Sequence, residues 1–97
     1  MMFIVSLTYL VELAEVEKHL QAHLEYLDKH YALGHFLASG PKSPRTGGVI
    51  LSHLDSREQL DAILNEDPFF RYGIANMEIT RFMPSKAAPG FEALLSL

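Results

Sequence analysis

The apolar residues of the chain change their spacing near Leu13, and this change most constrains the fold. Residues 3–10 (FIVSLTYL) are β-branched and aromatic, and both alternating sets are largely apolar, which predicts a strand covered on both faces. Over residues 13–31 the spacing becomes that of a helix, whose apolar side holds Val16, Leu20, Leu24, Leu27 and Tyr31. Gly34 ends this pattern. The chain therefore begins with a strand and an amphipathic helix that must pack on a sheet.

Two strands, a helix and a last strand are predicted after Gly34. Residues 35–41 and 48–54 are apolar runs joined by the turn-rich KSPRTGG, which predicts a hairpin with a mobile loop. Asp55 or Ser56 can cap a second helix, because each has a Glu or Gln three residues later. The buried side of this helix would hold Leu60, Ile63 and Leu64.

This second helix must end near Glu66, because Pro68 disfavours helical geometry at the residue before it. A short irregular piece follows. Residues 74–82 then alternate apolar and polar side chains, which predicts a half-buried strand. The order strand, helix, strand, strand, helix, strand is that of a ferredoxin-like α+β fold, with two helices on one face of a four-stranded antiparallel sheet.

The length of 97 residues supports one hydrophobic core, so we expect a single domain over residues 1–97. Residues 83–97 contain two prolines and a glycine, and they are predicted to form a tail with a short terminal helix.

The sheet would have a bare face, because two helices cover only one side of it. The apolar residues that we assign to the bare face are Ile4, Leu37, Ile50 and Phe82. An exposed apolar face usually marks an interface, so we predict a homodimer that packs through the sheet faces. The alternative is that the tail folds back over this face within one chain, using Phe91, Leu94 and Leu95.

Charge and composition argue against several partners and sites. The formal net charge is −4, and the eight Lys and Arg residues form no cluster, so a nucleic-acid partner is not expected. No cysteine is present, which excludes disulfides, thiolate metal ligands and cysteine nucleophiles. The apolar start lacks basic residues and soon reaches Glu12, so neither a signal peptide nor a membrane span is predicted. We expect a soluble, cytoplasmic protein.

His23 is the first candidate for chemistry. It lies three residues after Leu20 and four before Leu27, so it should face the sheet. The best acidic partner is Asp67, whose backbone is restricted by Pro68. A rigid carboxylate orients an imidazole and selects its tautomer, which is what a general acid–base pair needs. The alternative is a structural role, because a half-buried histidine more often bonds a backbone carbonyl.

The segment LASGP supplies a second candidate group, Ser39, Gly40 and Pro41. A glycine beside a hydroxyl at a strand end lets a ligand approach backbone N–H groups, which favours contact with an anion or oxyanion. The same letters also describe an ordinary strand end. Phe69 would add an apolar wall next to Asp67. We predict substrate binding for these four residues.

No cofactor or metal is expected. His19 and His23 form an HxxxH pair, a spacing that zinc ligands use, but no HExxH pattern accompanies it. His30, His35 and His53 are scattered, and we predict them at the surface or at strand ends. Neither GxGxxG nor a P-loop is present.

Three motifs together resemble the YciI-like (YCII-related) family: AHLEYL with His23, LASGP with Ser39 and Gly40, and EDPFF with Asp67. The resemblance covers nearly the whole chain, from the first strand to the RFMP that ends the last. It implies a ferredoxin-like domain of the dimeric α/β-barrel type. It also implies a His and Asp pair in a pocket, matched here by His23 and Asp67.

The function that this resemblance implies is acid–base chemistry on a small, cyclic substrate. The family includes a dehydrochlorinase for a chlorinated hydroxyquinol, and related barrel families include muconolactone isomerase-like enzymes, so a cofactor-independent lyase or isomerase is expected. Many relatives carry an arginine shortly before the histidine, where this chain has Gln21 and Ala22. The alternative is a binding or accessory module that holds a small molecule in the same pocket.

Overall fold

The elements follow the predicted order, with one short helix added. A computed structural model describes all residues, 1–97. In chain order it contains β1 (Met2–Tyr9), α1 (Leu13–Ala32), β2 (Phe36–Pro41), β3 (Gly47–Ser52), α2 (Arg57–Leu64), α3 (Pro68–Arg71), β4 (Ala75–Phe82) and a terminal 3-10 helix (Glu92–Ser96). The addition is α3, which occupies the piece that we expected to be irregular.

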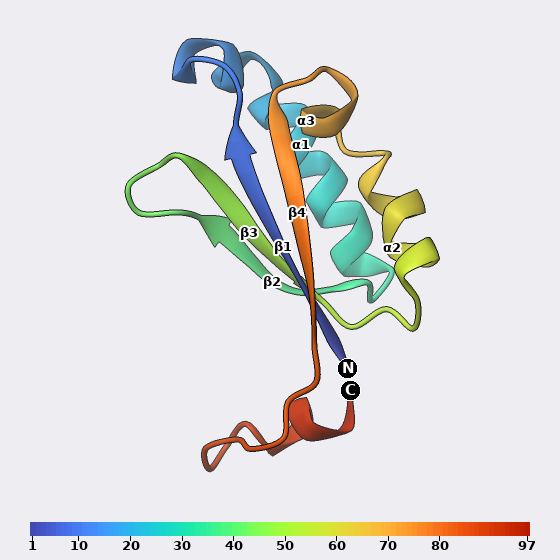
Figure 1. Cartoon of the computed structure of the whole chain (residues 1–97). Coiled ribbons are helices and arrows are strands. Elements are labelled where there is room, and N and C mark those ends of the chain that lie inside the picture. The colour runs from blue at the N-terminus through green and yellow to red at the C-terminus, as the bar shows by residue number, and fades with distance from the viewer.

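The four strands form one sheet in the order β2-β3-β1-β4, and every neighbouring pair is antiparallel. Helices α1, α2 and α3 all lie on the same face of this sheet (Figure 1). The fold is therefore the α+β, ferredoxin-like arrangement that the sequence predicts. It places the middle of α1 opposite the β2–β3 hairpin, where the candidate site lies.

Local signals in the sequence explain where the first two helices begin or end. Gly34 follows α1 with a φ of 79°, a conformation that glycine adopts without steric cost. Ser56 caps α2, because its side chain accepts a hydrogen bond from the backbone N–H of Gln59. The buried residues of α2 are the predicted Leu60, Ile63 and Leu64.

Helix α1 buries a more polar face than the spacing of its leucines predicts. Its buried residues are Val16, His23, Tyr26, Leu27 and His30. Leu24 and Tyr31, which we expected on the buried side, are 44% and 37% exposed. The difference arises because the histidines and Tyr26 find hydrogen-bond partners inside the fold, which removes the main cost of burying them. No helix of the chain, α1 included, combines the length and apolar character needed to cross a bilayer.

The strand register corrects one residue assigned to the bare face of the sheet. Ile50 pairs with Val5, and both are buried on the helix side. The face away from the helices, which we call the outer face, carries the alternate residues. Its apolar members include Ile4, Leu51 and Phe82, and its polar members include Ser6, Thr80 and Glu78. Leu51 therefore takes the place on the outer face that we assigned to Ile50.

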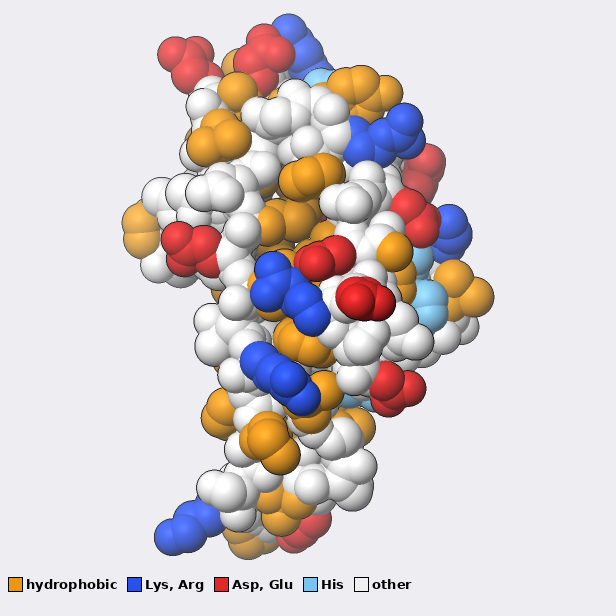
Figure 2. Space-filling model, turned by 45° about the vertical axis from the view of Figure 1, so that its right-hand side comes forward, with side chains coloured by type: hydrophobic (Ala, Val, Ile, Leu, Met, Phe, Trp, Pro, Cys, Tyr) orange, Lys and Arg blue, Asp and Glu red, His pale blue; other side chains and the backbone are white.

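The tail does not cover the outer face, so the single-chain alternative is wrong. Residues 83–97 run past the end of the sheet, and the two chain ends lie side by side (Figure 1), where the Met1 amino group donates to the Leu97 carbonyl. Phe91 and Leu95 remain 61% and 45% exposed. In Figure 2 the lower end of the molecule is a narrow extension of the main body. The predicted terminal helix is present as one short 3-10 segment.

Candidate active site

Asp67 is held in place by its own local sequence. It is the N-cap of α3, where its Oδ1 atom accepts the backbone N–H of Phe69 at 2.9 Å. Pro68 occupies the first helical position, where the φ that its ring imposes suits a helix. The side chain of Asp67 is completely buried. The DPFF segment thus builds a rigid, desolvated carboxylate.

His23 reaches this carboxylate from the middle of α1. Its Nδ1 atom lies 2.8 Å from Oδ1 of Asp67. The imidazole also stacks flat on the ring of Phe69, with the centroids 3.9 Å apart and the planes 2° from parallel. An ionised carboxylate only accepts hydrogen bonds, so Nδ1 donates and the neutral tautomer leaves a lone pair on Nε2. The ring is therefore fixed by one hydrogen bond and one stacking contact.

The second carboxylate oxygen, Oδ2 of Asp67, is buried and has no hydrogen-bond partner. Such buried, unsatisfied oxygens are rare and usually mark strain or a functional group. Burial first, and the negative charge of Asp67 second, raise the pKa of Tyr26. Its neutral hydroxyl donates to the carbonyl of Ile63 at 2.8 Å. Tyr26 thus joins α1 to α2 behind the pair.

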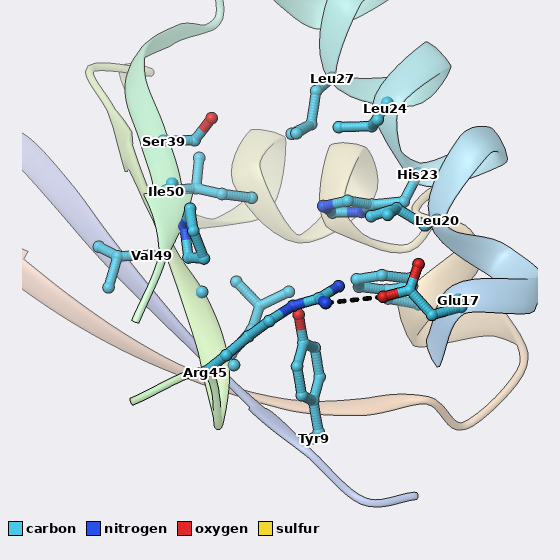
Figure 3. A pocket seen from close by; sticks show the side chains of 16 residues that line it. Tyr9, Glu17, Leu20, His23, Leu24, Leu27, Ser39, Arg45, Val49 and Ile50 are labelled. Atoms are coloured by element: carbon cyan, nitrogen blue, oxygen red, sulfur yellow. Dashed lines mark hydrogen bonds and ion pairs between the residues drawn. The ribbon is translucent and has the colours of Figure 1, made fainter. Parts of the chain in front are cut away.

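His23 lines a cavity of about 620 Å³ between α1 and the β2–β3 hairpin. Its apolar wall includes Leu7, Leu20, Leu24, Leu27, Ile50 and Phe69. Figure 3 shows the His23 ring projecting into this space from α1. Pockets of roughly 300–1,000 Å³ hold small organic ligands, so a single substituted ring fits in this one.

The LASGP residues form the opposite wall of the same cavity. Ser39, Gly40 and Pro41 all line it from β2. Figure 3 shows Ser39 across the space from His23. Oγ of Ser39 accepts a hydrogen bond from the hydroxyl of Tyr31 at 2.7 Å, which leaves the proton of Ser39 free to donate. A Cβ built on Gly40 would meet nothing within 4 Å, so the wall is open there. The structure thus brings together all six residues that we singled out, with Asp67 directly behind His23.

Three polar residues of this cavity escaped the sequence analysis: Tyr9, Glu17 and Arg45. Nη1 of Arg45 lies 2.6 Å from Oε1 of Glu17. The carboxylate of Glu17, and next the hydroxyl of Tyr9, raise the pKa of Arg45. Of these three residues, only Glu17 could have been placed near the cavity from the sequence, because it precedes Leu20 by three residues and so lies on the same side of the helix. Arg45 sits in the predicted turn between the two strands, where no periodicity shows the direction of a side chain.

Comparison with known proteins assigns the family. The YCII-related domain matches residues 2–83. The chain belongs to the YCII-related family. A search of curated proteins gives no match. Among solved structures, this YCII-related chain is similar to 5-chloro-2-hydroxyhydroquinone dehydrochlorinase from Burkholderia phenoliruptrix, determined in complex with 2,5-dihydroxybenzoquinone. The TM-score is 0.73 at 20% identity, covering 84% of this chain and 93% of that one, a likeness that concerns the fold.

The other histidines of this YCII-related domain lie apart from the His23 and Asp67 contact. His19 stacks on Tyr72, with ring centroids 4.9 Å apart. His30, which we predicted near the surface, is only 2% exposed. Its Nδ1 atom lies 2.9 Å from Nδ1 of His35 and its Nε2 atom 3.2 Å from Glu66. The prediction failed because these partners come from the residue just before β2 and from the segment just after α2.

Proposed function

We propose that this chain is a cofactor-independent enzyme of the lyase or isomerase type that moves a proton on a small, cyclic substrate. The observation that carries the proposal is the 2.8 Å contact between Nδ1 of His23 and Oδ1 of the buried Asp67, at the wall of a cavity large enough for a small cyclic compound. A general acid–base pair requires this combination of a positioned imidazole and access for substrate. The dehydrochlorinase with a similar fold, bound to a ring compound, gives independent support.

In the proposed lyase step, Nε2 of His23 takes a proton from a hydroxyl or a saturated carbon of the ring, in its keto tautomer where the substrate is a phenol. The electron pair of that O–H or C–H bond forms a new C=O or C=C double bond, and the leaving group departs from a saturated ring carbon with its own bonding pair. In an isomerase step, the same proton returns to a different carbon of the ring. Asp67 keeps Nδ1 protonated and stabilises the imidazolium that forms. The hydroxyl of Ser39 and the open backbone at Gly40 and Pro41 stabilise developing charge on a ring oxygen.

The test is turnover of ring substrates by His23→Asn, with 5-chloro-2-hydroxyhydroquinone as the first compound and chloride release as the readout. We expect the variant to lose about 10²–10⁴-fold in kcat, the usual contribution of a general base. His19→Asn is the matched control, because this histidine lies one turn earlier on α1 and outside the cavity. Equal turnover by wild type and both variants on every substrate would refute the proposal.

A second candidate is a non-catalytic module that binds a small molecule in the same cavity. The observation that favours it is the capping bond from Asp67 to Phe69, which gives the carboxylate a structural task without any chemistry. This candidate predicts that a ligand binds wild type and leaves unchanged. Recovery of chemically intact ligand, with no effect of His23→Asn beyond affinity, would favour it over the enzyme.

We also propose that two copies pair through their outer faces in the manner of a dimeric α/β-barrel. This proposal is supported by the apolar members of that face, Ile4, Leu51 and Phe82, which lie on three adjacent strands. Phe82 is 45% exposed in a single copy. Aromatic residues are enriched in protein interfaces, so a second copy that covers Phe82 would account for this exposed side chain.

A further inference from the structure

One ion pair joins the two walls of the cavity. Arg45 stands on the loop between β2 and β3, and Glu17 stands near the start of α1. Of all the ion pairs in the chain, only this one joins α1 to the β2–β3 loop. Figure 3 shows Arg45 extended below His23 toward Glu17, with the hydroxyl of Tyr9 beside the guanidinium.

This pair is exchangeable because water reaches both partners. The side chains of Arg45 and Glu17 are 38% and 50% exposed. Ion pairs in that setting contribute little, since solvent and salt compete for each charge. A guanidinium has five N–H donors, and Glu17 contacts Nη1 alone. Arg45 can therefore release Glu17, or keep it and still donate to a second acceptor.

The polar lining of the cavity favours an anion over a cation as that second acceptor. Arg45, Tyr9 and Ser39 all carry hydrogen-bond donors on side chains that line the space. Glu17 is the only carboxylate among the lining residues, and it already lies against Arg45. An anionic oxygen on a ring would meet a charged, fork-shaped donor in partly apolar surroundings, where charge-assisted hydrogen bonds are strongest.

We propose that Arg45 recognises an anionic oxygen of the ligand, such as a phenolate, an enolate or a ring carboxylate, and that Glu17 occupies the guanidinium until this oxygen arrives. Naming the ligand a substrate rests on the proposed function, but recognition of the anion does not. The basic side chain that lines this cavity is Arg45, from the loop between β2 and β3. The positions shortly before His23 on α1 hold the uncharged Gln21 and Ala22.

The experiment compares ring anions with neutral rings of the same shape, using wild type, Arg45→Gln and Glu17→Gln. The probes are benzoate with benzamide, and the phenolate of 4-nitrophenol with 4-nitroanisole, measured by calorimetry and NMR. We expect the anions to bind wild type more tightly than their neutral partners. Arg45→Gln should weaken anion binding about tenfold or more, as expected for one charge-assisted hydrogen bond, and leave the neutral rings unchanged.

Glu17→Gln should strengthen anion binding, because it removes the competing carboxylate. Arg57→Gln is the control, since it breaks another solvent-exposed Arg–carboxylate ion pair, on α2 and outside the cavity. The proposal is overturned if no ring anion binds better than its neutral partner, or if Arg45→Gln weakens both equally. Tight binding of benzylamine that Glu17→Gln abolishes would also overturn it, because Glu17 would then be the recognition group.

His23→Asn separates this inference from the proposed function. The variant should still bind ring anions in a manner that depends on Arg45, even though it should lose turnover. If no turnover is ever found but the Arg45 pattern holds, only the enzyme proposal fails. If turnover depends on His23 but is confined to uncharged rings, only the anion proposal fails.

Discussion

A single oxygen, Oδ1 of Asp67, serves both local folding and the proposed chemistry. It accepts the backbone N–H of Phe69 as the cap of α3, and it contacts the imidazole of His23. A variant at this position therefore mixes two effects unless the two tasks are separated. Asparagine offers that separation, because its side-chain oxygen can still cap the helix but carries no charge.

We predict that Asp67→Asn folds nearly as well as wild type but loses most turnover, because an amide cannot stabilise an imidazolium. Asp67→Ala should lose stability as well as turnover. Removing the cap of α3 costs about 0.5–2 kcal/mol, and leaving the buried Nδ1 donor of His23 unpaired costs about 1–3 kcal/mol more. Urea unfolding and kcat measured on both variants check this. If the asparagine variant retained full turnover, Asp67 would be a capping residue only.

Tyr26 differs from Asp67 in that its hydrogen bond supports the fold alone. Its hydroxyl donates to Ile63 behind the site and does not line the cavity. Tyr26→Phe should destabilise the fold by about 0.5–1.5 kcal/mol, the net contribution of one hydrogen bond, because the Ile63 carbonyl still accepts the backbone N–H of Glu66. The variant should leave kcat unchanged. Parallel unfolding and kinetic assays test this. A large fall in kcat in a fully folded variant would mean that Tyr26 takes part in the chemistry.

At the scale of elements, the sequence predicted what periodicity encodes and missed what depends on distant partners. The strands and the two longer helices were found because their apolar residues repeat with periods of two and 3.6. His23 and Asp67 were paired because a helix face and a proline each restrict one side chain. The prediction for His30 was wrong because one of its two partners, Glu66, lies 36 residues away. The prediction for Leu24 was wrong because His23 and Tyr26, with hydrogen-bond partners inside the fold, take the buried side of the helix. Arg45 was missed because it lies in a loop, where no periodicity shows the direction of a side chain.

The end of α1 should make folding sensitive to acid. Burial lowers the pKa of His30, more than the neighbouring Glu66 raises it, and the charges of His35 and Lys29 lower it further. Because the folded pKa lies below the unfolded value of about 6.5, the unfolded chain binds the extra proton. The stability that this group contributes is therefore complete above the unfolded pKa and is lost as the pH falls from there through the lower folded pKa.

The measurement is the urea midpoint of wild type and His30→Gln at a series of pH values from neutral downwards. Wild type should lose stability below about pH 6.5, and the variant should lose less over the same range. His53→Gln is a control, because this histidine makes no side-chain hydrogen bond in the structure. Identical pH profiles for wild type and His30→Gln would show that His30 is not the group that titrates.

At the scale of the whole molecule, the helix layer and the outer face differ in what each leaves exposed. Phe82 on the outer face and Phe70 on α3 are 45% and 48% exposed, so the two phenylalanines form a matched pair on opposite sides of the sheet. On the outer face this side chain lies on the same surface as apolar residues of adjacent strands, Ile4 and Leu51. An interface through the sheets should depend on that side alone.

We predict that Phe82→Asp shifts the protein from dimer to monomer, because it places a charge without a partner in the proposed interface. Phe70→Asp makes the same chemical change at similar exposure and should leave the dimer intact. Light scattering after size-exclusion chromatography gives the mass of each variant, and circular dichroism checks that both fold. A monomeric wild type, or dissociation caused by Phe70→Asp alone, would place any interface elsewhere than on the outer face.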